Sequence, residues 1–178
     1  LFIMRDPRDV AVSFFFHVRN RASVRELDRK GITSVDRSLE LHDFIRSEKL
    51  GVSRVIEHMN RWYEEMQHMQ HTSVIKYEEM RADTEQVLDK VLTFLDRKFE
   101  PETIKAAVEF ASFDNLSRKE ASGFFNSDKL KPTDAKDGDS YKVRRGKIGG
   151  YQDYFDDELN AYLDSLVKDQ LNPVFGYR

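Results

Sequence analysis

The first nine residues constrain the fold more than any other segment of the chain. Residues 1–4 are a continuously apolar run, and a polar turn follows at once. Such a run is typical of a strand that is covered on both faces, as in a parallel sheet. Asp6 is a favourable N-cap, Pro7 suits the first helical position, and Asp9 is placed to reach back as in a capping box. We therefore predict a strand, a polar turn and a helix over about 10–18, which is half of a β–α–β unit.

One further strand and several helices are predicted along the chain. Residues 72–77 are the second strand candidate. The spacing of apolar residues predicts helices at about 39–48, 53–70, 84–95, 101–111 and 157–170, with Trp62 in the core. We interpret residues 19–38 as a mobile, highly charged connection and residues 112–140 as loop. Strands that alternate with helices indicate an α/β protein with a parallel sheet flanked by helices. Two strands are few, because about five or six are usual in a sheet.

Composition excludes several classes of protein. The 178 residues suit one domain, and no apolar run approaches the roughly 18 residues that a membrane helix needs. The chain has no cysteine, which excludes a disulfide framework, a thiolate zinc site and a cysteine nucleophile. The net charge of −3 argues against a general nucleic-acid coat. His68 and His71 are three positions apart with no third ligand nearby in the sequence, so we predict no metal site.

The first polar cluster follows the first predicted strand, at the end where ligands of open α/β sheets bind. Arg5 leaves the strand at this point, and its guanidinium group is suited to bidentate phosphate binding. Ser13 lies farther along the predicted helix and can add a hydroxyl donor. In the structural alternative, Arg5 pairs with Asp9 and Ser13 bonds a carbonyl within its own helix. Spacing alone leaves both interpretations open.

Two more clusters are candidates for ligand binding. Tyr77 ends the second predicted strand, where it can contact a nucleobase or simply fill the sheet edge. Residues 142–150 contain four cations and three glycines, and backbone N–H groups beside glycine can approach an anion closely. This segment is either a phosphate or sulfate site or a solvated basic turn that touches nucleic acid with steep salt dependence. It matches neither the dinucleotide-binding glycine motif nor the Walker pattern.

Taken together, these clusters resemble a known family. Residues 5–14, Arg-Asp-Pro-Arg-Asp-Val-Ala-Val-Ser-Phe, resemble the 3′-phosphate-binding motif of sulfotransferases that use 3′-phosphoadenosine 5′-phosphosulfate (PAPS). Residues 144–151 resemble the C-terminal Arg-Lys-Gly-x-x-Gly-x-Trp loop of that family, although Gly150 and Tyr151 depart from the acidic–Trp pair of animal cytosolic members. The second strand lies between the two motifs, as in the family. The resemblance extends from the first residue to the last and looks closest to bacterial-type members.

The resemblance implies a P-loop-NTPase-like sulfotransferase fold. Residues 1–178 would be the C-terminal portion of a single sulfotransferase domain whose N-terminal part is missing. The residues that it assigns to the cofactor are Arg5, Ser13, Tyr77, Ser112, Phe113, Arg144, Arg145 and Gly146. The two residues of the first motif and the three of the C-terminal loop would hold the 3′-phosphate, and the others would face the adenine. The Ser-Phe pair matches less closely, because Ala111 stands where the family usually has threonine.

The implied reaction moves a sulfuryl group from PAPS to a hydroxyl or amine of a small-molecule or glycan acceptor and releases 3′-phosphoadenosine 5′-phosphate (PAP). The resemblance also implies a cytoplasmic enzyme without a metal. Its P-loop-like segment and its catalytic base would precede Leu1, so we expect the catalytic residues upstream. Residues 19–50 and 114–141 are expected to shape the acceptor pocket or a lid. The main alternative is a truncated, non-catalytic module that binds PAP or another nucleotide; a nucleotide kinase on a related fold is weaker.

Overall fold

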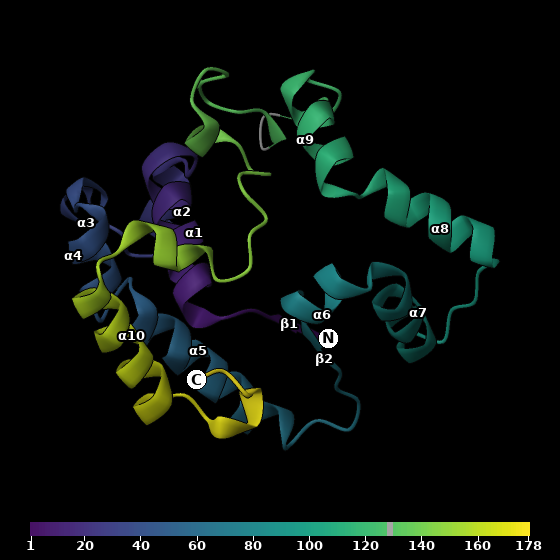
Figure 1. Ribbon diagram of the computed structural model, residues 1–178, viewed down its shortest axis with the longest axis horizontal. Helices are drawn as coiled ribbons and strands as arrows, with labels where there is room; N and C mark the ends of the chain where they lie inside the picture. The colour runs from purple at the N-terminus through teal and green to yellow at the C-terminus, as the bar shows by residue number, and fades with distance from the viewer. Residues whose placement is uncertain (128–129) are drawn as a thin grey trace.

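A short parallel sheet lies between two groups of helices (Figure 1). The structure, a computed structural model, describes residues 1–127 and 130–178. Strands β1 (Phe2–Met4) and β2 (Val74–Lys76) pair in parallel, with Phe2 opposite Val74 and Met4 opposite Lys76. The helices are α1 (Pro7–Asn20), α2 (Val24–Arg29), α3 (Ser34–Ser38), α4 (Leu41–Arg46), α5 (Val52–Met66), α6 (Tyr77–Ala82), α7 (Thr84–Phe94), α8 (Pro101–Phe110), α9 (Phe113–Ala121) and α10 (Asp157–Gln170), with short 3-10 helices η2 (Gly138–Ser140), η3 (Gly150–Tyr154) and η4 (Pro173–Phe175). The predicted α/β alternation is confirmed.

The turn between β1 and α1 folds as its residue types predict. Asp6 is the N-cap of α1, and its carboxylate accepts a hydrogen bond from the backbone N–H of Arg8 at 2.9 Å. Pro7 occupies the first turn, where a backbone N–H has no acceptor within the helix, so proline costs no helical hydrogen bond. The capping box predicted for Asp9 is wrong. The Asp9 carboxylate instead accepts hydrogen bonds from the backbone N–H groups of Gly149, the N-cap of η3, and Tyr151 within η3, which lie 140 and 142 positions along the chain.

Helices α1, α5 and α10 enclose the main hydrophobic core, and Figure 1 shows them packed on one side of the sheet. Val12, Val52 and Leu163 are at most 2% exposed in this core. Helix α10 runs over the predicted residues 157–170, and the Asp156 carboxylate caps it by accepting from the backbone N–H of Leu159 at 2.8 Å. The apolar stripes predicted for these helices therefore meet as expected.

The core position predicted for Trp62 is wrong. Its side chain is 37% exposed, at the rim of α5. The indole ring stacks on Phe2 of β1, with ring centroids 5.5 Å apart and an interplanar angle of 17°. Ile56, Met59 and Met66 carry the buried face of α5. The apolar stripe predicted for α5 was too wide, because Trp62 at its edge covers strand β1 and does not enter the core.

A second core lies under residues 22–50, where we predicted a mobile charged connection followed by one helix. The mobile connection is wrong, because residues 22–38 fold into α2 and α3, whereas the helix predicted at about 39–48 is present as α4. Leu27, Ile32, Phe44 and Leu50 are each at most 5% exposed and form one core cluster with Phe15 of α1. Each short helix contributes one or two apolar residues, so no long periodic stripe appears in the sequence. The many charges lie on the outer surface of a packed segment.

Helices α6 to α9 continue the chain on the far side of the sheet from α10 (Figure 1). Asp83 caps α7, the helix predicted at about 84–95, by accepting from the backbone N–H of Gln86 at 2.9 Å. Pro101 opens α8, also as predicted. The prediction of a loop from residue 112 onward is wrong at its start, since Ser112 is the N-cap of α9. This extra helix carries residues that border the candidate site.

Candidate functional site

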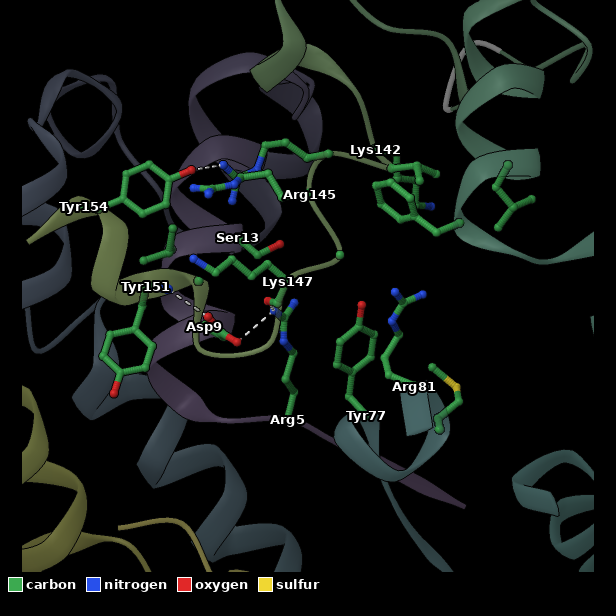
Figure 2. Close-up of a pocket in the computed structure, with 18 of the residues that line it drawn as sticks. Arg5, Asp9, Ser13, Tyr77, Arg81, Lys142, Arg145, Lys147, Tyr151 and Tyr154 are labelled. Carbon is green, nitrogen blue, oxygen red and sulfur yellow. Dashed lines mark hydrogen bonds and ion pairs between the residues drawn. The ribbon is translucent and has the colours of Figure 1, made fainter. Parts of the chain in front are cut away.

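The side chains that follow the two paired strands meet at one edge of the sheet. Arg5 follows β1 and Tyr77 follows β2, so the parallel register places them side by side. The guanidinium carbon of Arg5 lies 4.4 Å from the centre of the Tyr77 ring, within the range of a cation–π contact. Figure 2 shows both side chains extending into the same cavity. The residues that follow the two predicted strands therefore meet at the carboxyl ends of the sheet, the edge where ligands of open α/β sheets bind.

These side chains border a cavity of about 350 Å³. Its wall is built by the β1–α1 segment, α6, the region around the start of α9, and residues 142–154 (Figure 2). The predicted site residues in the wall are Arg5, Ser13, Tyr77, Phe113, Arg144, Arg145 and Gly146. Ser112 is not among the described residues that line the cavity. It is the N-cap of α9 and so sets the position of Phe113, the first helical residue.

Arg5 combines the two interpretations that its spacing left open. Its Nη2 donates to Oδ2 of Asp9 at 2.8 Å and to the backbone carbonyl of Lys147 at 2.7 Å. The structural ion pair therefore forms, and the side chain still lines the cavity. The Arg5 Nε is buried without a hydrogen-bond partner, one of two such side-chain atoms in the described part of the chain. An unpartnered buried donor costs about 1–3 kcal/mol, so a ligand oxygen at this atom is favoured.

Ser13 lies four residues after Asp9 on α1, so both side chains face the cavity. Among the described residues the Ser13 hydroxyl has no hydrogen-bond partner, and its side chain is exposed in the cavity wall. The alternative in which this hydroxyl bonds a carbonyl of its own helix is therefore wrong. A polar ligand can use it as a donor.

A buried carboxylate of α9 fixes the path of the basic loop. Glu120 is 2% exposed and accepts from the backbone N–H groups of Lys142 and Val143 at 2.6 and 2.8 Å. It also accepts from Nη1 of Arg21 at 3.3 Å. These bonds align the loop along α9 and let the following residues enter the cavity wall. Sequence reasoning missed Glu120, because an acid within a polar helix gives no signal until its distant partners are known.

Gly146 is the point where the basic loop touches the aromatic wall. Its φ is +59°, in the left-handed region that favours glycine. A Cβ at this position would lie 2.7 Å from Cδ2 and 2.8 Å from Cε2 of Phe113. Only a hydrogen fits between the loop backbone and that ring. The two predicted residues therefore meet through a contact that requires glycine.

Arg144 is turned inward and held by several partners. Its guanidinium carbon lies 4.0 Å from the centre of the Phe16 ring. Its Nη1 donates to Asp139 at 3.1 Å and to the hydroxyl of Tyr154. The side chain is only 15% exposed. This placement contradicts the interpretation of residue 144 as part of a solvated basic turn.

Arg145 and Lys147 share one acidic partner, Asp153 of η3. The Lys147 ammonium donates to both carboxylate oxygens at 2.7 Å. Hydrogen bonds from Lys147 and then Arg145 hold the pKa of the Asp153 carboxyl below its usual range. Both cations line the cavity, as Figure 2 shows, while Asp153 limits their net charge.

Arg81 is a lining residue that sequence reasoning missed. It lies four residues after Tyr77, so α6 presents the two side chains together (Figure 2). Its guanidinium carbon lies 5.8 Å from the centre of the Phe113 ring. Within the described residues, neither the Arg81 guanidinium nor the Lys142 ammonium forms an ion pair with an acid; Lys142 bonds Glu120 through its backbone N–H alone. The helical spacing from Tyr77 is the signal that would have identified Arg81.

The charges of the cavity determine what it can bind. Six cations line it, Arg5, Arg81, Lys142, Arg144, Arg145 and Lys147, against one acid, Asp9. Together with the Tyr77 and Phe113 rings, these cations have the chemistry that suits a ligand with a flat ring and phosphate-type anions. No group of three metal-binding side chains occurs in the described residues. None of the helices in residues 1–127 and 130–178 has the length and apolar character to cross a membrane.

The fold and the cavity define an α/β protein with a cavity lined by cations at the carboxyl ends of two parallel strands. Residues 1–174 match the family model described as the sulfotransferase domain, so the chain belongs to the sulfotransferase family. It is 22% identical over 172 residues to the 3-alpha-hydroxysteroid sulfotransferase of Cavia porcellus, which covers 96% of this chain and 55% of that protein. It is 25% identical over 177 residues to cytosolic sulfotransferase 14 of Arabidopsis thaliana, covering 96% and 48%. The chain spans about half the length of these curated relatives.

Solved structures confirm the predicted fold. Mouse sulfotransferase SULT7A1, solved in complex with PAP, aligns with a TM-score of 0.67 and 21% identity over 94% of this chain and 56% of that one. Retinol dehydratase, solved with retinol and PAP, aligns with a TM-score of 0.64 and 22% identity over 94% and 46%. The two-stranded sheet and its helices therefore correspond to about half of a sulfotransferase fold.

Proposed function

We propose that this chain binds PAPS and its product PAP through the 3′-phosphate and the adenine. In this proposal residues 1–178 are the C-terminal portion of one PAPS-dependent sulfotransferase domain. One observation carries the proposal. A single cavity joins an arginine with a buried, unpartnered N–H, an unpartnered serine hydroxyl and a basic glycine loop. The complexes of the structural relatives with PAP support the choice of nucleotide.

The 3′-phosphate would occupy the space between Arg5, Ser13 and the loop residues 144–146. Arg5 Nε and the Ser13 hydroxyl are donors without partners, and the loop adds two cations and a close backbone. Hydrogen bonds to a charged phosphate contribute about 1.5–3 kcal/mol each, so these groups would favour PAP over a nucleotide without this phosphate.

The adenine would lie near Tyr77 and Phe113, two of the aromatic rings of the cavity wall. Ser112 would act by starting α9 and so positioning the second ring. Flat aromatic walls stabilise a nucleobase through stacking or edge contacts. This half of the site would orient the nucleotide, while the sulfonate end would extend away from the two rings.

In the proposed reaction, the bond between the sulfuryl sulfur and the bridging phosphate oxygen breaks as a bond from sulfur to the acceptor oxygen or nitrogen forms. The acceptor loses a proton to a base, and PAP leaves. We assign no catalytic residue in this chain and include no metal. The names of the relatives, which include steroid and amine sulfotransferases, support a small-molecule acceptor. One relative is named as cytosolic, which supports a cytoplasmic location.

Calorimetric titration of the 178-residue chain with PAP and AMP tests the binding half of this proposal. We expect PAP to bind at least tenfold more tightly than AMP, because the 3′-phosphate adds charge-assisted hydrogen bonds. Ser13→Ala should reduce this preference. Ser165→Ala is the matched control, since this helix serine of α10 bonds only the carbonyl of Tyr162. Equal binding of PAP and AMP by the unchanged chain would contradict the proposal.

Transfer of labelled sulfate from PAPS separates the enzyme from a truncated binding module. The measurement compares this chain with a version extended upstream of Leu1. Transfer by the extended version supports the enzyme, whereas PAP binding without transfer in either version supports the non-catalytic module. If neither version binds PAP, both proposals are wrong.

A further inference from the structure

The Asp9 carboxylate is the point where the two halves of the proposed phosphate site are joined. Its side chain is 2% exposed and receives three hydrogen bonds. Oδ2 accepts from Arg5 Nη2 at 2.8 Å and from the backbone N–H of Gly149 at 2.9 Å, and Oδ1 accepts from the backbone N–H of Tyr151 at 3.0 Å. Figure 2 shows the carboxylate between Arg5 and the loop.

A carboxylate in an anion site requires an explanation, because its charge repels a bound phosphate. At Asp9 the charge is neutralised by Arg5, and the remaining acceptor capacity is used by two backbone N–H groups. A buried charge that is paired and fully hydrogen-bonded is stable, and it fixes the direction of every donor around it. The Asp9 carboxylate therefore orients the donors around it and does not itself bind the phosphate.

The basic loop is also hydrogen-bonded to Arg5 directly, through a backbone carbonyl of the loop. The carbonyl of Lys147 accepts from Arg5 Nη2 at 2.7 Å. Arg5 Nη2 therefore has two protein acceptors, while its Nε has none. Residues 144–146 directly precede this attachment, so the position of the basic loop and the orientation of the arginine depend on the same few bonds.

We propose that Asp9 is a positioning residue for the 3′-phosphate, a role that rests on the function proposed above. It holds Arg5 and the basic loop at the separation that one phosphate requires. Removing its charge makes the cavity more positive, so a purely electrostatic role predicts tighter binding of any anion. Positioning predicts the opposite for PAP, because the donors lose their alignment even though the net charge becomes more favourable.

Asp9→Asn and Asp153→Asn form a matched pair that separates these two effects. Each variant removes one negative charge near the cavity. Among the described residues, the Asp153 carboxylate bonds the side chains of Arg145 and Lys147 alone, so its loss leaves the loop backbone attached. The amide of Asp9→Asn instead sets an N–H₂ group against backbone N–H donors.

Calorimetry with PAP and AMP measures the outcome. We expect Asp9→Asn to weaken PAP binding by roughly tenfold or more, the effect of losing one charge-assisted hydrogen bond, and to change AMP binding by about twofold at most. Asp153→Asn should bind PAP as tightly as the unchanged chain or more tightly. The inference is wrong if Asp9→Asn binds PAP as Asp153→Asn does, or if it loses PAP and AMP affinity equally. If the unchanged chain shows no preference for PAP, the proposed function fails and the inference fails with it.

Amide hydrogen exchange of the unchanged chain gives a second test that needs no variant to fold. The N–H groups of Gly149 and Tyr151 should exchange slowly without ligand, since both are bonded to a buried carboxylate. Saturating PAP should slow them further, and AMP should not. Unprotected exchange at both positions, or equal protection by the two nucleotides, would overturn the role of Asp9.

Discussion

Replacing Gly146 with alanine tests the contact between the basic loop and the aromatic wall. The backbone φ of +59° disfavours any side chain, at a cost of about 1–2 kcal/mol for an L-residue. The new Cβ would also lie 2.7 Å from the Phe113 ring, well inside contact distance. Overpacking of this kind adds about 1–3 kcal/mol. If about 2 kcal/mol of this strain appears as displacement of the loop or ring, PAP affinity falls roughly 30-fold.

Substitutions at two other glycines separate the backbone cost of the positive φ from the packing cost of the new Cβ. A Cβ at Gly123 or Gly138 would meet no atom within 4 Å, and of these two only Gly123 has a positive φ, +68°. Gly123→Ala therefore measures the backbone cost alone, and Gly138→Ala should be nearly neutral. The excess destabilisation of Gly146→Ala over Gly123→Ala in urea unfolding gives the packing cost.

The double variant Phe113→Ala with Gly146→Ala completes the test. Removing the ring relieves the clash, so the glycine substitution should cost less in this background than in the unchanged chain, for both stability and PAP affinity. Calorimetry and urea unfolding on the four proteins measure the coupling. The reasoning is refuted if Gly146→Ala binds PAP within twofold of the unchanged chain, or if its cost is the same with and without the ring.

Three further substitutions test the supporting structure. Glu120→Gln should lower the urea midpoint and weaken PAP binding, because one of two backbone N–H groups of the basic loop loses its acceptor at about 1–3 kcal/mol. Phe44→Ala should destabilise the chain by about 3–5 kcal/mol, whereas a loosely packed connection would lose less than about 1 kcal/mol. Hydrogen bonds from Lys30 and then His17 lower the pKa of Glu26 from 4.5 to about 2. Its contribution to stability is therefore complete above pH 4.5 and is lost as the pH falls toward 2, so Glu26→Gln should flatten the decline in unfolding free energy over that range. The same dependence of the unfolding free energy on pH in Glu26→Gln and in the unchanged chain would refute this role of Glu26.

Local chemistry made much of the fold predictable. Asp6 and Pro7 mark the start of α1 through interactions within one turn, and residues 157–170 show a complete helical stripe with its cap. The convergence of Arg5 and Tyr77 also followed from sequence, because parallel strands bring their carboxyl ends together. These features depend on neighbours along the chain or on one general rule of sheet topology.

What could not be predicted depends on partners far apart in sequence. Asp9 resembles a capping residue locally, yet its partners lie 140 and 142 positions away. Glu120 is an ordinary helical acid until the loop backbone folds over it. The helices of residues 22–50 are too short to show a period, and the core that they share with α1 stabilises them.

The stack of Trp62 on Phe2 lets intrinsic tryptophan fluorescence report on the position of strand β1. Trp62 is the only tryptophan in the sequence, so all of the indole emission comes from one place. That place is the face of β1, three residues before Arg5, and the ring is still 37% exposed to solvent. Undocking of the first strand would expose the indole fully and shift its emission to the red. Fluorescence can therefore follow the strand that carries the proposed phosphate ligand without any label.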